Sequence, residues 1–225
     1  MTAPGGRGLF GRRAPTVLRA VPRAGLGEPH KDVFTPPPAE RQLPMRQTSV
    51  AASSEPSWLF VAAHGGAGAR LLAQLSWQPY EAALDAAYHG ETVEEWPGYG
   101  MCAGRAWPDP ELEPTAAVVV VCRTTMRGLA WARDLAAQYL SGQAPERLHL
   151  LGLVTIADVP GRLPPTITAS RGLVAGAYTQ HWPVPYVPEY RLLTGLPDEP
   201  RPPLHPVVAD VLAEIRTLTS KGPIS

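Results

Sequence analysis

The stretch that decides the fold runs from Trp58 to Leu72 and reads WLFVAAHGGAGARLL. Its first part belongs to a short apolar run at 57–63, which follows a proline and precedes glycines, and this is typical of a buried parallel strand. Its last part begins a helix, because Leu71, Leu72 and Leu75 recur at helical spacing. Glycines between the two parts let the backbone turn sharply. The stretch therefore predicts a strand, a tight glycine turn and a helix in succession.

Strands and helices continue to alternate along the chain. The strongest strand is predicted at 116–122, where AAVVVVC is apolar and rich in β-branched residues, as in strands buried on both faces. Further strands are expected at 148–156, at the proline-containing sheet edge 182–187, and as a short edge strand around 101–106. Helices are predicted at 68–76, at 79–89 with Pro79 in the first turn, from Thr124 or Thr125 to Ser141, at 166–178 and at 207–218. This order predicts a three-layer α/β fold, in which helices flank a mainly parallel sheet with right-handed crossovers.

The carboxyl ends of the predicted strands are the expected place for a ligand. In open parallel sheets, ligands bind beyond these ends, which all lie at one edge. The segments concerned here are 64–68, 123–125, 157–162 and 186–191. We therefore expect these four segments to meet.

The first 55 residues differ in composition from the rest of the chain. They are rich in Pro, Gly, Arg and Ala, and residues 1–50 hold eight basic residues against three acidic ones. Such a segment cannot bury enough apolar surface to offset its ordering entropy. We predict a disordered Pro/Arg-rich tail at 1–55 and a single α/β domain at 56–222. The tail could dock on a protein partner, on nucleic acid or on an anionic surface, but we favour a solubilising leader.

The overall composition restricts the class of protein. The chain has 225 residues and a formal net charge of zero, so no global field favours nucleic acid or membranes. No stretch approaches the roughly 18–20 apolar residues of a membrane span, and no apolar segment of a secretory signal is seen. The two cysteines, Cys102 and Cys122, form no CxxC pair, which predicts neither a disulfide framework nor a metal site. We therefore expect a cytoplasmic protein.

The glycine turn has the context of a phosphate-binding loop. Glycines let successive N–H groups point inward, and the following helix adds its positive end. The side chains depart from the P-loop pattern, because Ala69 stands in place of the lysine and Arg70 in place of the Ser or Thr that holds magnesium. The candidate phosphate-binding residues are His64, Gly65, Gly66, Ala67, Gly68, Ala69 and Arg70. The alternative is that the glycines only make a tight strand–helix turn.

The loop resembles the deviant Walker loop of ParA/MinD-type ATPases, Lys-Gly-Gly-x-Gly-Lys-Ser/Thr. His64 stands in place of the signature lysine, and Ala69 in place of the second lysine. The stretches 118–125, 150–158 and 182–191 resemble later segments of that fold. Residues from about 57 to 195 are also similar to an uncharacterised actinobacterial family associated with plasmids and integrative elements. These resemblances imply a degenerate P-loop NTPase-like fold in a mobile-element, partition or conjugation context.

Two charged residues at strand ends are candidates for contact with a nucleotide. Arg123 ends the central strand and could contact an anion. Asp158 ends the next strand, which approaches the base in proteins of the ParA/MinD type. The simpler alternatives are an exposed strand-end arginine and an aspartate that begins a turn. No strand with the aspartate of a Walker B motif is predicted, since region 90–114 is loop-like.

Three functions remain open at this point. The first is a non-hydrolysing P-loop-like adaptor or regulator that binds ATP, another nucleotide or phosphate weakly. The second is a protein–protein interaction module without a ligand. The third is a slow ATPase whose missing residues come from a partner or from Arg70. We expect no catalytic residue, because the Walker lysine and the magnesium-binding hydroxyl are absent.

Overall fold

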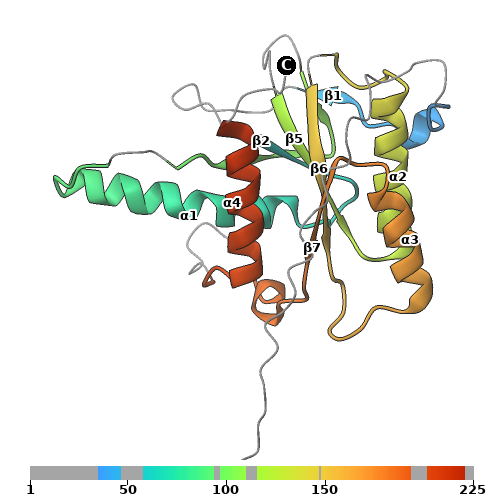
Figure 1. The fold of residues 1–225 in the computed structure, drawn as a ribbon. Coiled ribbons are helices and arrows are strands. Elements are labelled where there is room, and N and C mark those ends of the chain that lie inside the picture. Colours follow the sequence, from blue (N-terminus) through green and yellow to red (C-terminus); the bar gives the residue numbers. More distant parts are fainter. Residues whose placement is uncertain are drawn as a thin grey trace, which may run out of the picture.

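A computed structural model describes residues 35–46, 58–93, 97–109, 116–146, 148–193 and 202–220. Its centre is a parallel five-stranded sheet in the order β3-β2-β5-β6-β7 (Figure 1). The strands are β2 (Trp58–Ala62), β3 (Gly100–Gly104), β5 (Ala116–Arg123), β6 (Leu148–Ile156) and β7 (Gln180–Val184). The helices are α1 (Ala69–Tyr88), α2 (Met126–Leu140), α3 (Pro165–Ala175) and α4 (Pro206–Ser220). The predicted α/β fold with a mainly parallel sheet is confirmed.

Helices cover both faces of this sheet, with α1 and α4 on one side and α2 and α3 on the other (Figure 1). The central strand β5 serves both faces in alternation. Val118 and Val120 belong to the core beneath α2, whereas Val119 and Val121 belong to the core beneath α1 and α4, and all four are fully buried. A parallel strand can be covered in this way only if it is apolar on both faces. The three-layer prediction is therefore confirmed.

The strand order creates a switch point between β2 and β5. From β2 the chain crosses to β3 on one side, returns to β5 on the other side, and continues outward through β6 and β7. In the sheet's own strand count this order is 2-1-3-4-5, as in flavodoxin-type doubly wound sheets. Because the chain leaves β2 toward β3 and leaves β5 toward β6, in opposite directions, a crevice forms at the carboxyl ends of β2 and β5, where such sheets bind ligands.

Both predicted edge strands are present with shifted bounds: β3 is 100–104 instead of about 101–106, and β7 is 180–184 instead of 182–187. β3 and β7 are the two outer strands of the sheet, and Pro183 lies in β7, where the outward side of the strand needs no backbone donor. β6 has the predicted bounds, 148–156.

None of the helices in the described residues is long and apolar enough to cross a membrane.

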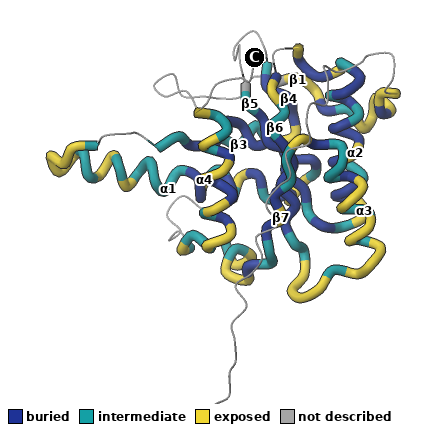
Figure 2. Tube along the Cα trace, viewed as in Figure 1, coloured by how far each residue is buried: buried dark blue, intermediate teal, exposed yellow. Residues whose placement is uncertain are grey.

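One continuous helix replaces the two helices predicted at 68–76 and 79–89. α1 runs through Pro79, so the prediction that this proline begins a second helix is wrong. A proline inside a helix removes one backbone hydrogen bond. The end of α1 projects beyond the sheet (Figure 2). The rings of Trp77 and Tyr99 also pack edge to face, with centroids 4.2 Å apart, and hold this part of the helix to the domain.

The predicted disordered tail is wrong for residues 35–46. These residues form a 3-10 helix, η1 (Ala39–Arg41), and a short strand, β1 (Met45–Arg46), which pairs in parallel with β4 (Trp107–Pro108). The rest of the predicted tail, 1–34 and 47–55, lies outside the described residues.

Leu43 is the residue that docks this N-terminal segment. Its side chain is 4% exposed and belongs to the core beneath α2. The buried side chain of Gln138 donates to its carbonyl oxygen at 3.1 Å and accepts from its N–H at 3.0 Å. Arg41 adds an ion pair with Asp134 at 3.0 Å. The buried Leu43 side chain and the amide of Gln138 therefore hold segment 35–46 on the domain, although the composition of this segment predicts disorder.

We predict that Leu43→Ala lowers the free energy of unfolding by about 2–4 kcal/mol, because the deletion leaves a cavity in the core. The control is Met45→Ala, since Met45 is 60% exposed, and its effect should stay below about 0.5 kcal/mol. Both values come from denaturant unfolding followed by circular dichroism. Equal stabilities of the two variants would show that the segment does not dock in solution.

Candidate functional site

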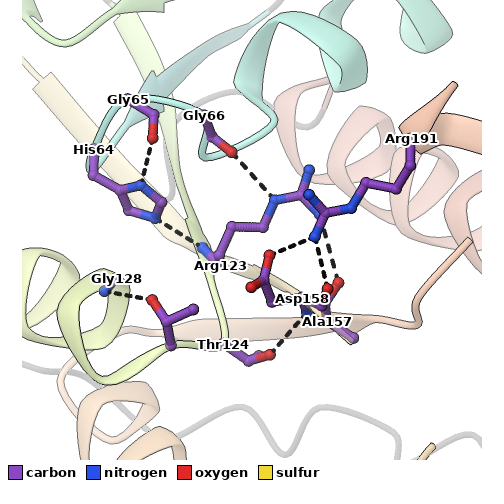
Figure 3. Close-up of polar contacts among 10 residues, drawn as sticks. His64, Gly65, Gly66, Arg123, Thr124, Gly128, Ala157, Asp158 and Arg191 are labelled. Atoms are coloured by element: carbon purple, nitrogen blue, oxygen red, sulfur yellow. Dashed lines mark hydrogen bonds and ion pairs between the residues drawn. The ribbon is translucent and has the colours of Figure 1, made fainter. Parts of the chain in front are cut away.

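Three of the four predicted strand-end segments are joined by hydrogen bonds at the switch point, and the fourth is joined to the third by an ion pair (Figure 3). The N–H of Arg123 donates to the His64 ring at 3.1 Å. The Thr124 hydroxyl accepts from the N–H of Asp158 at 3.3 Å. Arg191 pairs with the Asp158 carboxylate. The expected meeting of these segments is confirmed.

The glycine loop offers backbone groups rather than side chains to a ligand. Gly66 and Gly68 have φ angles of 76° and 102°, a conformation that favours glycine. No side chain caps the start of α1, so the N–H groups of its first turn have no such partner. Ala67 and Ala69 are buried in the core, which leaves only their main-chain groups for a ligand. Arg70 is exposed.

The His64 ring joins the ends of β2 and β5. Its Nε2 accepts from the N–H of Arg123, and its Nδ1 lies 2.8 Å from the carbonyl oxygen of Gly65, to which it donates in the neutral tautomer protonated at Nδ1. Contact with a phosphate through this ring would break one of these bonds. The residue in place of the signature lysine therefore connects two loops, a role that its sequence position did not predict.

The start of α2 packs closely against the His64 ring and the main chain of Arg123. Thr125 is the N-cap residue of α2, and its hydroxyl accepts from the N–H of Gly128 at 3.0 Å. A Cβ atom at Gly128 would lie 2.9 Å from Nε2 of His64 and would also meet the carbonyl oxygen of Arg123. Gly128 is therefore required by close approach, and it brings α2 against the crevice.

The cation above the glycine loop comes from β5 instead of α1. Nε of Arg123 donates to the carbonyl oxygen of Gly66 at 3.2 Å, and Nη1 lies 3.5 Å from that of Ala157. Burial lowers the pKa of Arg123, and the charge of Arg191 lowers it further, whereas Asp158 and Tyr186 oppose this change. The predicted ligand-proximal Arg123 thus spans two loops of the crevice.

Asp158 lies in the same group of residues. Nη2 of Arg191 donates to the carboxylate of Asp158 and, at 2.7 Å, to its carbonyl oxygen. The guanidinium of Arg191 also lies over the ring of Tyr186, 5.7 Å from its centroid. Asp158 begins a bend, as the simpler alternative proposed, and its carboxylate faces the crevice as well. Arg191 was placed at a strand end by the sequence, but its ion pair was not predicted.

The crevice contains a small hollow behind the two arginines. Besides Arg123 and Arg191, its lining includes Leu71, Val184 and Tyr186, and its free space holds about one water molecule. A nucleotide base does not fit this space without movement of the lining. This hollow is therefore too small to be a base pocket as it stands.

A second polar contact lies on the other face of the sheet. Nε2 of His181 lies 2.9 Å from the hydroxyl of the fully buried Thr155. Burial lowers the pKa of His181 to about 4, with a smaller contribution from the charge of Arg171. This ring is therefore neutral near pH 7.

The comparisons with known proteins leave the site to be interpreted from its geometry. No family model matches the chain, and no curated protein is similar to it. In the described residues, no group of three or more His, Cys, Asp or Glu side chains is arranged to hold a metal ion.

We predict that Gly128→Ala and Gly172→Ala change stability in opposite directions, although both glycines are helical. The first should lower the free energy of unfolding by about 1–3 kcal/mol, because the new methyl group meets His64 and the backbone of Arg123. The second should raise it by about 0.5–1 kcal/mol, because the space around Gly172 is open. Denaturant unfolding measures both changes. A stabilising Gly128→Ala would contradict the close packing at the crevice.

We also predict that the free energy of unfolding falls as the pH is lowered from about 6.5 to about 4. In this interval His181 is protonated in the unfolded chain but neutral in the folded one, so acid favours unfolding. His181→Gln should remove this part of the pH dependence. His149→Gln is the control, since His149 is exposed. The test is the unfolding midpoint of each variant, measured across this pH range. The prediction is contradicted if the midpoint of His181→Gln changes with pH as steeply as that of the wild type and of His149→Gln.

Proposed function

We propose that this chain is a degenerate P-loop protein that binds a phosphate-bearing ligand and does not hydrolyse it. The observation that carries the proposal is the strand–glycine loop–helix unit at the switch point, with Gly66 and Gly68 at positive φ and an uncapped α1. Main-chain N–H groups at such a helix start attract anions. Arg123 supports the proposal, since it adds a positive charge directly above the loop.

The absence of hydrolysis follows from the side chains of the loop. Phosphoryl transfer in P-loop proteins uses the loop lysine and a hydroxyl that holds magnesium. Ala69 is buried and has no charge, and Arg70 carries no hydroxyl. Together with the resemblance to ParA/MinD-type proteins, this supports an adaptor or regulator in a partition, conjugation or mobile-element system of the cytoplasm. A slow ATPase would need the missing groups from a partner.

A second candidate is a protein-interaction module. The observation in its favour is the projecting end of α1, where Leu84 and Tyr88 are 50% and 87% exposed. Large apolar side chains on a projecting helix are typical of contact surfaces. The two functions are compatible, because α1 begins at the glycine loop and ends at this surface.

We predict that the wild type binds ATP, ADP or inorganic phosphate in calorimetric titrations, and that Gly65→Asp weakens binding about threefold to tenfold. A negative charge beside the loop repels an anion. A Cβ atom at Gly65 meets nothing within 4 Å, so the substitution should fold. By contrast, a side chain at Gly68 would lie 2.7 Å from Ile156 at a strained φ.

The control for charge is Gly65→Asn, which has the same shape and should bind as the wild type does. Thermal melting establishes that each variant is folded. Absence of binding to the wild type would favour the interaction module, and magnesium-dependent turnover would favour the slow ATPase.

A further inference from the structure

Two guanidinium groups meet at the carboxyl edge of the sheet from distant parts of the chain. Arg123 ends β5, and Arg191 ends the 3-10 helix η2 (Pro188–Arg191) (Figure 3). The charge of Arg191 contributes to lowering the pKa of Arg123, so the two groups are close enough to repel each other. Bringing two like charges together costs free energy unless an anion offsets it.

Within the described part of the chain, Asp158 is the one carboxylate that forms an ion pair at this place. Asp158 forms an ion pair with Arg191, whereas Arg123 donates to the neutral carbonyl oxygens of Gly66 and Ala157. Among the described residues, no carboxylate lies within 4.0 Å of the guanidinium nitrogens of Arg123. These three side chains therefore carry one excess positive charge, which faces the glycine loop.

We propose that Arg123 and Arg191 together bind one terminal phosphate group as a dianion without magnesium, and that Asp158 is the internal counter-ion that this phosphate displaces from Arg191. The inference rests on the proposed function, because the phosphate lies at the mouth of the loop 64–70. It names the class of ligand, a phosphate monoester or inorganic phosphate. Paired N–H groups of arginine match phosphate oxygens, and a terminal phosphate carries nearly two negative charges at neutral pH.

Magnesium is unnecessary in this arrangement for electrostatic reasons. In a P-loop, lysine and the metal together neutralise the phosphates. Here two guanidinium groups supply two positive charges to the phosphate once Asp158 is displaced. Arg70 stands where the pattern requires the magnesium-binding hydroxyl, and it adds a further positive charge near the loop. A metal ion would meet repulsion from all three arginines.

The exchange of partners at Arg191 is physically easy. The side chains of Arg191 and Asp158 are 38% and 35% exposed, so water replaces the ion pair at little cost. The hollow behind them holds about one water molecule, so the phosphate must enter from the solvent side, where the Arg191 side chain is exposed. Asp158 orients the arginine until the ligand arrives.

The test is calorimetric titration of the full chain with inorganic phosphate, and with ATP in EDTA or in magnesium. Arg123→Gln and Arg191→Gln should each weaken binding about tenfold or more. Asp158→Asn should tighten it about threefold or more, since the competing carboxylate is gone. Arg133→Gln is the matched control. It also removes an arginine that pairs with an aspartate, but this pair lies on α2, and Asp134 keeps its second ion pair, with Arg41. Magnesium should not strengthen the binding of ATP.

The gain of affinity in Asp158→Asn separates a role in binding from a role in folding, because a variant that is merely destabilised does not bind more tightly. Unchanged or weaker binding by this variant overturns the inference, and so does binding that requires magnesium. If Gly65→Asp weakens binding while the arginine variants do not, the result supports binding by the glycine loop and contradicts binding by Arg123 and Arg191. If the arginine variants weaken binding while Gly65→Asp does not, the result supports binding by Arg123 and Arg191 and contradicts binding by the glycine loop. No binding of either ligand to the wild type overturns both.

Discussion

The burial of β5 on both faces is the constraint on which the rest of the structure depends. Val118 to Val121 send alternate side chains into two separate cores, and none of them is exposed. A strand in this position has no face left for polar groups. The helices must then cover both sides of the sheet, and the chain must cross over between parallel strands. The polar side chains next to β5 in the sequence are therefore found at its ends.

At the carboxyl edge, such polar side chains join four loops into one connected group. Arg123 is the first polar side chain after the buried run of β5, and it and its neighbour Thr124 bond to two other loops, 64–68 and 157–162. The P-loop pattern places its cation on the helix that follows the loop. In this chain that position is the buried Ala69, and the positive charge arrives from the neighbouring strand. The cation beside the glycine loop therefore comes from a different part of the sequence than the P-loop pattern would place it.

The sequence predicted the elements well where the signal was local. Residues adjacent in the sequence were enough to predict two strands: β5, from its uninterrupted β-branched run, and β6, with its bounds. The errors arose where distant residues decide. Pro79 looked like a helix start, but α1 runs through it, and Trp77 beside it packs on Tyr99 from another part of the chain. Residues 35–46 looked disordered, because Gln138, which holds Leu43, lies 95 residues away in the chain.

The strand–glycine–helix unit and the absence of a lysine at position 69 were determined by the sequence alone, because turn geometry and side-chain identity are local properties. The strand-end segments could also be located, since hydrophobic periodicity marks where each strand stops. Only the tertiary structure decided that His64 joins two loops and that Arg123 covers a loop 57 residues away. It also decided that Arg191 pairs with Asp158. The physical reason is that hydrogen-bond and ion-pair partners depend on which strands lie side by side, and that order is a property of the folded sheet.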